Sequence, residues 1–275
     1  MPMKCHQRIV REQHAQEPDP LLEEKMAFAQ SFDSASVREI TNAEAKTVIK
    51  KYEWLGNMGT TDYSFGLFFG PHLAGVECFG RRAGTKSAAS VCGEKYAHMV
   101  KTLCRGACVH WAHPHSASFF IPRACRLMAE KGFHIFAAYS DVEAGEIGTV
   151  YQATNWLYCG TNNSAASSFI WPKKPVANDA TWGRFKDGAL RDERNIHGLT
   201  RIRKFAGDNG AYRVKFSRRD LRERMVREGF LFFKSPPKRR YVTFAGDKKL
   251  VKELRAALNW DVLPYPRRED AEIAA

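Results

Sequence analysis

The fold of this chain is indicated by the stretch Tyr139-Ser-Asp-Val-Glu-Ala-Gly-Glu-Ile-Gly-Thr-Val-Tyr-Gln-Ala-Thr-Asn-Trp-Leu-Tyr-Cys-Gly160. The apolar run from His134 to Tyr139 predicts a short buried strand, which stops at the polar pair Ser140-Asp141. Open α/β sheets carry their chemistry at such strand ends. We therefore expect a functional site where this strand ends.

A short helix is expected after the loop that follows. Thr149 can cap its first turn. One side of the helix is apolar, with Val150, Ala153 and Leu157. Tyr151 and Asn155, four residues apart, share the other side. Asp141 and Tyr151 are thus expected to face a common cleft.

Both residues also have a purely structural interpretation, because an Asp after a strand often forms a turn and a Tyr on a short helix often packs. A resemblance favours function. Ser140-Asp141 followed by Gly148-Thr-Val-Tyr-Gln-Ala-Thr-Asn-Trp156 and Leu-Tyr-Cys-Gly160 closely resembles the signature of phage Mom-like DNA-modification proteins. The resemblance is specific over 139–160 and otherwise follows the order of elements over about 40–268.

This resemblance implies an α/β fold of the GNAT acetyltransferase type, with a mixed central sheet flanked by helices and a basic C-terminal extension. It also implies a transferase that converts the exocyclic N6 amine of adenine in DNA to a carbamoylmethyl (acetamido) derivative, which protects phage DNA from host restriction. The alternative is an N-acetyltransferase of the same fold that acts on a protein or small-molecule amine.

Adenine N6 is a poor nucleophile, so its alkylation needs a positioned proton acceptor. Asp141 is the expected base, directly or through the hydroxyl of Tyr151, which can both accept and donate. Asn155 either binds the Watson-Crick edge of a base or satisfies backbone groups.

The composition fits a folded protein of the host-cell cytoplasm. No run approaches the roughly 18 apolar residues that span a membrane, and the first residues lack a signal pattern. The seven cysteines are scattered, which fits reduced thiols. Cys104 and Cys108 are either metal ligands or, by the alternation around them, small core residues of a strand.

The net charge of +13 is unevenly distributed. Residues 181–275 hold 24 Lys and Arg against 13 Asp and Glu, whereas residues 1–180 hold 19 against 17. Double-stranded DNA is the expected partner of such a basic region, and a generally basic solubility surface is the alternative. Lys238, Arg239 and Arg240 are the expected phosphate contacts.

Three parts are expected along the chain. Residues 1–35 predict a loose N-terminal arm with a short helix near 21–30, residues 36–170 a GNAT-like catalytic core, and residues 171–275 a DNA-binding extension packed on that core. In the core, Asn42 is expected to cap a helix that ends between 51 and 56. The Tyr52-Glu-Trp54 segment after it is either packing or a platform on which a base stacks.

Two apolar runs around Gly70-Pro71 predict an antiparallel hairpin over 63–80. GNAT proteins place such a hairpin before the strand that binds the acyl donor, here expected at 103–111. A helix is expected over 118–131. The junction between this strand and this helix lacks the Gly-rich loop that binds the pyrophosphate of coenzyme A in acetyltransferases.

Mom-like proteins share that departure and carry a Ser at the junction. Ser118, or Ser116 by a shifted alignment, is therefore either an N-cap or a residue that positions the donor. The nearby His110, His113 and His115 suggest a metal weakly, and the resemblance makes iron or an acetyl-CoA-derived donor possible. The sequence identifies neither, and we assign no metal ligand.

The basic third contains a predicted helix at 217–228. A closing hairpin is expected from 230–233 and 240–244, followed by a helix over 247–258.

Overall fold

A computed structural model describes residues 5–53, 56–82, 86–141, 146–162 and 238–267, and the backbone of three short strands at 167–170, 196–197 and 231–234. The chain divides into two compact units. Residues 1–162 and 238–275 form the first, which we call the core unit, and residues 163–237 form the second. The predicted helix at 217–228 lies outside the described residues.

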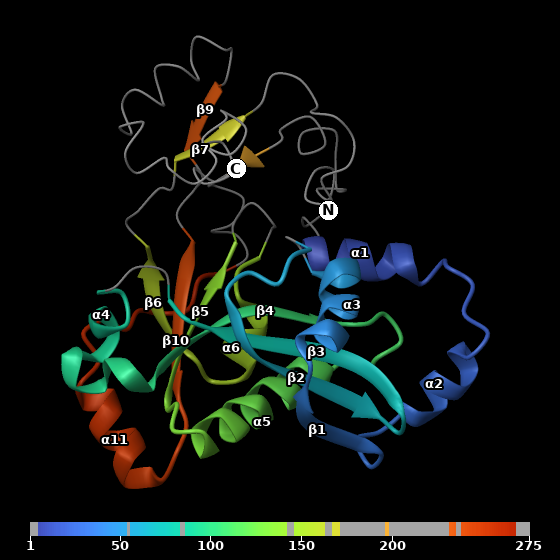
Figure 1. The fold of residues 1–275 in the computed structure, drawn as a ribbon, viewed down its shortest axis with the longest axis horizontal. Coiled ribbons are helices and arrows are strands. Elements are labelled where there is room, and N and C mark those ends of the chain that lie inside the picture. Colours follow the sequence, from blue (N-terminus) through green and yellow to red (C-terminus); the bar gives the residue numbers. More distant parts are fainter. Residues whose placement is uncertain are drawn as a thin grey trace. The chain divides into compact units, whose positions relative to one another are not determined.

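In the described part of the core unit, seven strands form one sheet in the order β1-β2-β3-β4-β5-β10-β6 (Figure 1). These strands are β1 (Ala35–Ile40), β2 (Thr61–Phe69), β3 (His72–Gly80), β4 (Val100–Cys108), β5 (Ile135–Ser140), β6 (Leu157–Thr161) and β10 (Arg239–Phe244). Neighbouring strands pair antiparallel, except that β4 and β5 are parallel. The mixed sheet and its flanking helices confirm the predicted α/β class, and β2 with β3 confirms the predicted hairpin.

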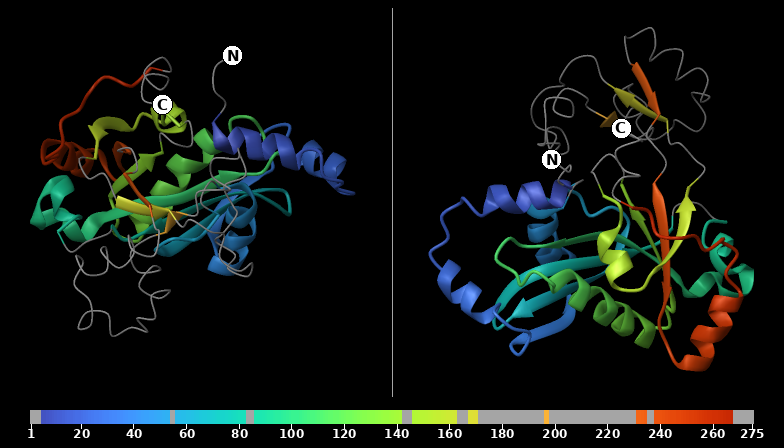
Figure 2. Two further views of the ribbon diagram at one scale, coloured as in Figure 1. Left: turned by 90° about the horizontal axis from the view of Figure 1, so that it is seen from above. Right: turned by 180° about the vertical axis from the view of Figure 1, so that it is seen from behind.

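The helices of the core unit flank this sheet. They are α1 (His6–His14), α2 (Leu22–Phe28), α3 (Asn42–Tyr52), α4 (Ala89–Cys92), the 3-10 helix η1 (Glu94–Met99), α5 (Ser116–Glu130), α6 (Thr149–Ala153) and α11 (Lys248–Ala256). α3 and α5 cover opposite faces of the sheet (Figures 1 and 2). Within the described residues, no helix is long and apolar enough to cross a membrane.

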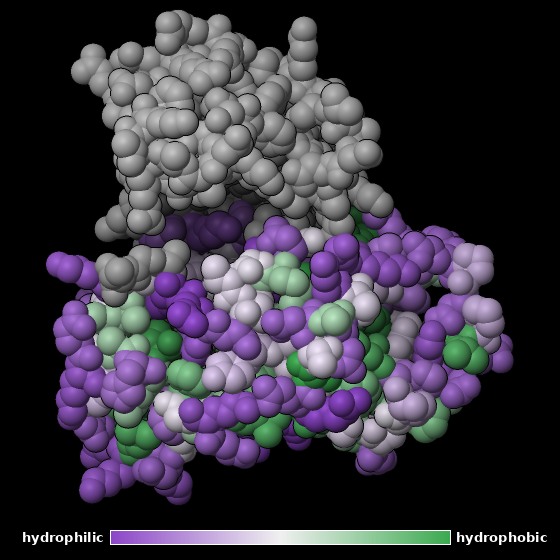
Figure 3. Space-filling view, in the orientation of Figure 1, coloured by the Kyte–Doolittle hydropathy of each residue, from purple (hydrophilic) through white to green (hydrophobic). Residues whose placement is uncertain are grey.

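The sheet and its helices bury a continuous apolar core, because each strand and helix turns its apolar side inward. The largest fully buried side chains include Trp156, Tyr241, Phe65, Phe69, Phe79, Phe120 and Phe136. Burying each such side chain stabilises the folded state by on the order of 1.5–3 kcal/mol. Hydrophilic residues cover most of the described face in Figure 3, and the apolar residues seen there form small patches.

β4 and β5 pair only over their first four positions, from Val100 opposite Ile135 to Leu103 opposite Ala138. Beyond this point β4 continues to Cys108 paired with β3, while β5 continues to Ser140 paired with β10. Figure 1 shows the two strands diverging. We call the region between the diverging halves the β4–β5 opening. It separates the end of β5 from the second half of β4.

The N-terminal arm differs from the sequence expectation, because α1 is docked on the core. The Gln7 amide donates to the Gly106 carbonyl oxygen of β4 at 2.8 Å, and Arg11 donates to the carbonyl oxygen of His110 at 3.3 Å. Val10 is buried among core residues. The arm is therefore ordered by hydrogen bonds that its composition did not reveal, while α2 lies where the short helix was expected.

Three predicted helix starts were wrong in detail. α3 begins after Thr41, whose side chain accepts from the Glu44 backbone in a capping box, so Thr41 rather than Asn42 is the cap. α6 begins after Gly148, not at a Thr149 cap. α5 begins at Ser116, and the Ser118 hydroxyl donates to the His115 carbonyl oxygen instead of capping the helix.

The expected C-terminal extension also needs a new boundary. β10 lies inside the sheet, between β5 and β6, and its Tyr241 and Val242 are completely buried. Residues 238–267 thus belong to the core, because a strand with a neighbour on each side satisfies its backbone and buries both faces. The predicted closing hairpin is wrong. β9 (Leu231–Lys234) pairs instead with β7 (Ser167–Ile170), which also pairs with β8 (Ile196–His197).

The sequence count shows where the basic charge lies relative to this boundary. Residues 163–237 hold 17 Lys and Arg against 8 Asp and Glu, a net charge of +9 of the total of +13. The second unit therefore carries most of the excess positive charge.

Candidate functional site

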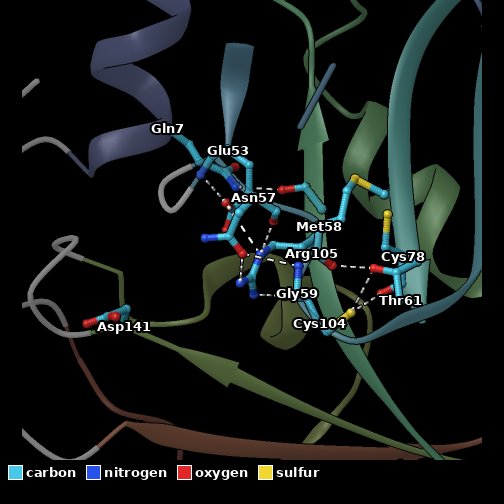
Figure 4. A network of polar contacts seen from close by, with 12 residues as sticks. Gln7, Glu53, Asn57, Met58, Gly59, Thr61, Cys78, Cys104, Arg105 and Asp141 are labelled. Carbon is cyan, nitrogen blue, oxygen red and sulfur yellow. Dashed lines mark hydrogen bonds and ion pairs between the residues drawn. The ribbon is translucent and has the colours of Figure 1, made fainter. Parts of the chain in front are cut away.

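Asp141 follows the last residue of β5, as the sequence predicts. Its Oδ2 forms an ion pair with Nζ of Lys238 at 3.0 Å, and the side chains of Asp141 and Lys238 are 14% and 37% exposed. Lys238 directly precedes β10, the strand that pairs with β5. The ion pair therefore joins the adjoining ends of these strands beside the β4–β5 opening. Figure 4 shows Asp141 at its strand end, apart from a second polar network around Arg105.

The loop that links Asp141 to α6 is held by β10. Arg239 donates from Nη1 to the Glu146 carbonyl oxygen at 3.2 Å, and the Tyr241 hydroxyl donates to the Ile147 carbonyl oxygen. Gly148 has a φ of +77°, and a Cβ there would lie 2.5 Å from Cζ of Tyr241. Glycine is required at this position because a side chain would collide with the ring that holds the loop.

Tyr151 lies in α6, packed against Trp156 and Tyr241 with ring centroids 5.1 Å apart in both cases. Burial raises the pKa of its phenol well above the ordinary value, and the nearby carboxyl of Glu77 raises it further. The hydroxyl is therefore protonated at neutral pH, so Tyr151 can orient a group or pass on a proton but is not an anionic base.

Glu146 is a residue that the sequence reasoning missed. Burial raises the pKa of its carboxyl to about 7, and the negative charges of Glu53 and Asp141 contribute in the same direction. The hydrogen bond to Asp141 and the charge of Lys238 act against this rise. Its backbone N–H donates to the Asp141 carbonyl oxygen at 3.1 Å. An acidic residue inside the loop between Asp141 and Tyr151 was the available signal.

A second polar network holds the segment that follows α3 (Figure 4). Arg105 on β4 donates from Nε to the Asn57 carbonyl oxygen at 2.6 Å and from Nη2 to Asn57 Oδ1 at 2.8 Å. Its Nε also lies 3.7 Å from Oε2 of Glu53, which accepts from the Gly56 N–H at 2.9 Å. Arg105 thus fixes the loop after α3 against β4. Trp54, the expected stacking residue in this loop, lies outside the described residues.

Glu77 on β3 is a buried carboxyl, 3% exposed. It stands directly opposite Gly106 of β4 in the strand register. Its Oε2 has no hydrogen-bond partner among the described residues, and burial raises its pKa well above the ordinary value. Burial therefore favours the neutral form of the Glu77 carboxyl over the charged form. A single acid within an apolar strand was a signal that the sequence analysis did not use.

Tyr52 does not offer a face for base stacking. It is buried in the core, where its hydroxyl lies 2.8 Å from Nδ1 of His110 and its ring packs edge-on against His14. Burial raises the pKa of Tyr52 to about 12. Of the two interpretations of Tyr52, its burial favours packing over base stacking, because the last turn of α3 points its ring into the protein.

The junction before α5 does not fit the pyrophosphate of coenzyme A. Pro114 lies inside the junction, no glycine occurs between 107 and 131, and the Ser116 N–H is bonded to the His113 carbonyl oxygen at 2.9 Å. The backbone N–H cradle that a pyrophosphate needs at a helix start is therefore missing. Ser116 is buried, and its hydroxyl has no partner within the described part of the chain. The Ser118 hydroxyl is already bonded to the His115 carbonyl oxygen, so Ser116 is the better of the two candidates for positioning the donor.

Two histidines of the junction, His113 and His115, lie side by side with ring centroids 5.6 Å apart, whereas His110 makes a separate contact. His110 bonds Tyr52, the His113 ring packs on Phe32 with centroids 4.5 Å apart, and the His115 N–H donates to His113 Nδ1 at 3.2 Å. Cys104 and Cys108 lie on β4, as the strand interpretation predicts. The described residues contain no group of three His, Cys, Asp or Glu side chains that could hold a metal ion.

Of the remaining residues expected to contact DNA, Arg239 and Arg240 make hydrogen bonds within the core unit, and Asn155 is exposed. Arg239 is buried and holds the loop at Glu146. Arg240 donates from Nε and Nη2 to the Cys159 carbonyl oxygen at 3.2 and 2.8 Å and stacks on Trp260. Asn155 lies in an exposed turn after α6 with a φ of +58°, so it does not share a helix face with Tyr151.

Comparison with known proteins gives a family. A family model described as the Mom protein family matches residues 34–267. A search of curated proteins finds no match.

Three solved structures are similar. The protein yncA from Salmonella typhimurium, with its cofactor acetyl-CoA, shows 10% identity over 47% of this chain and 83% of its own, with a TM-score of 0.34. An N-acetyltransferase from Staphylococcus aureus Mu50 shows 12% identity over 48% and 90%, with a TM-score of 0.34. An acetyltransferase from Bacillus subtilis in complex with CoA shows 8% identity over 77% and 98%, with a TM-score of 0.35. Because the family model spans most of the sequence, this chain belongs to the Mom protein family.

Proposed function

We propose that the protein modifies DNA by transferring a carbamoylmethyl group to the N6 amine of adenine, which protects phage DNA from host restriction. The family match supports a transferase that acts in DNA modification. The observation that carries the proposal is the group of ionisable side chains at the end of β5, where Asp141 is paired with Lys238 at 3.0 Å beside Glu146. Alkylation of an amine needs such a proton acceptor.

The chain's own residues would orient the amine and receive its proton. The protonated Tyr151 hydroxyl can donate to the substrate or relay a proton, and Asp141 is held in a fixed position by Lys238. The Ser116 hydroxyl at the start of α5, which is buried and has no partner among the described residues, is the candidate for positioning the donor. Because the junction does not fit the coenzyme A pyrophosphate, no step is assigned to coenzyme A.

The second unit would make most of the contacts with DNA phosphates, because residues 163–237 carry a net charge of +9. Phosphate contacts from Lys and Arg supply sequence-independent affinity. The target amine lies inside the duplex, so the nucleotide has to be flipped out at a cost of a few kcal/mol. Phosphate contacts on both sides of the flipped base can offset that cost.

The test is mass spectrometry of nucleosides from a plasmid co-expressed with the protein. Wild-type protein should give an adenosine adduct heavier by a carbamoylmethyl group, and Asp141→Asn and Tyr151→Phe should nearly abolish it. Asp261→Asn, at an exposed position outside the site, is the matched control and should retain the adduct. No adduct with wild-type protein, together with acetyl-CoA-dependent acetylation of amines, would replace this proposal with the acetyltransferase alternative.

A further inference from the structure

Within the proposed function, on which this inference rests, we propose that Glu146 is the carboxylate that accepts the proton from adenine N6, while Asp141 acts as its positioning partner.

Glu146 is fixed from two sides. Its N–H donates to the Asp141 carbonyl oxygen at 3.1 Å, and its own carbonyl oxygen accepts from Arg239 at 3.2 Å. The next residues, Ile147 and Gly148, are held against Tyr241 of β10. These contacts hold the backbone of Glu146 at a defined position between the end of β5 and the start of α6. Catalytic groups need this kind of support, because small displacements cost large factors in rate.

The other candidate bases are less suited. The Asp141 carboxylate is paired with Lys238 at 3.0 Å, so protonating it would break that ion pair. The pKa of Tyr151 is raised well above its ordinary value, and so is that of Glu77, which is almost completely buried. Glu146 is half-buried as a residue, so it is less enclosed than Glu77.

Among the described residues, the charged groups that act on the Glu146 carboxyl lie on three elements. Glu53 at the end of α3 and Asp141 at the end of β5 are negative, and Lys238 before β10 is positive. Arg239 donates to the backbone carbonyl oxygen of Glu146. Burial and the two acids hold the pKa at about 7, so the carboxylate and the acid are both populated at physiological pH. A base in this range combines availability with proton affinity.

Adenine N6 attacks the methylene carbon of an acetamide donor that carries a leaving group on this carbon. The new N6–C bond forms as the bond to the leaving group breaks, and the leaving group departs with the electron pair. One N6 proton moves to the Glu146 carboxylate, and no oxidant or reductant is consumed.

The first experiment measures adduct formation in buffered lysates of expressing cells supplied with unmodified plasmid, from pH 5.5 to 9, with initial rates from nucleoside mass spectrometry. The wild-type rate should rise with pH through about 7, because the carboxylate form is the active one. Glu146→Gln should lower the rate by ~10²- to 10⁴-fold, and Glu146→Asp should restore part of it. Glu130→Gln, at the exposed end of α5, is the matched control.

Asp141→Asn separates the two roles. Its residual rate should still respond to pH, because Glu146 is present, although the midpoint should fall when a negative neighbour is removed. The residual rate of Glu146→Gln should lose the response near pH 7. Full activity in Glu146→Gln, or an unchanged pH response in that variant, would overturn the inference while the adduct in wild type leaves the proposed function standing.

The second experiment does not depend on activity. Carbon-13 NMR of carboxyl-labelled glutamate, compared between wild type and Glu146→Gln, should show one resonance that titrates near pH 7 and disappears in the variant. A Glu146 carboxyl that titrates near the ordinary value of 4.5 would overturn the inference even if no adduct were ever found.

Discussion

Adding a single methyl group at Gly106 tests the buried pairing of Glu77 and β4. In Gly106→Ala, the new Cβ would lie 2.8 Å from Cδ and 2.9 Å from Oε1 of Glu77, and closer still to Oε2. Ordinary contact begins at 3.4 Å. The whole Glu77 carboxyl would therefore have to move by several tenths of an ångström, and it is buried within a packed sheet.

The size of the effect follows from this geometry. Inserting a methyl group into a packed core typically costs about 1–3 kcal/mol, because side chains and backbone shift to make room. For a folded unit of this size, each kcal/mol lowers Tm by roughly 2–4 °C. We therefore expect Tm to fall by roughly 2–12 °C in Gly106→Ala.

The assay is thermal unfolding followed by circular dichroism, with a double-mutant cycle as the control. Glu77→Ala removes the carboxyl that the new methyl group would strike, so Gly106→Ala should cost less stability in that background than alone. Equal costs in both backgrounds, or a Gly106→Ala protein as stable as wild type, would refute the contact between Glu77 and β4.

Two further predictions concern charge. The raised pKa of Glu77 means that its contribution to stability is present at pH values below its unfolded pKa and is lost as pH rises towards the folded one. The side chain in Glu77→Gln cannot ionise, so the Tm of this variant should rise relative to that of wild type between pH 5 and 8. Parallel curves of Tm against pH for the two proteins would contradict this. Arg240→Lys keeps the charge but loses the paired bonds to Cys159 and the stacking on Trp260. This substitution should lower the free energy of unfolding by about 1–2 kcal/mol in urea titrations. It should leave the salt dependence of DNA binding unchanged. A weaker salt dependence in the variant would show that Arg240 contacts a phosphate after all.

Periodic patterns predicted the local elements well. The hairpin around Gly70, the strand before Asp141 and the helix after Asp247 were each predicted from alternation, turn residues and caps, and the structure contains all three. Helix starts were less certain, because Thr41 and Asn42 are both good caps. The capping box with Glu44 decides between them only when its geometry is known.

The candidate site was predicted in part. The signature around Asp141 and Tyr151 identified the right loop, but the sequence did not indicate that Lys238 pairs with Asp141 from almost a hundred residues away. The importance of Glu146 was hidden for the same reason. Its pKa depends on burial and on Glu53, a residue of a distant helix end.

The sequence by itself determined the α/β class, the hairpin, the strand that ends at Asp141 and the resemblance to the Mom family, because these depend on local periodicity and on an ordered motif. Only the tertiary structure decided that β10 enters the sheet between β5 and β6 and brings Lys238, Arg239 and Tyr241 to the site loop. A strand pattern does not specify its partners, since backbone hydrogen bonding is the same for every residue. The charge on Arg239 and Arg240 predicted a polyanion contact, whereas their position in a central strand turned them toward carbonyl oxygens of the protein itself.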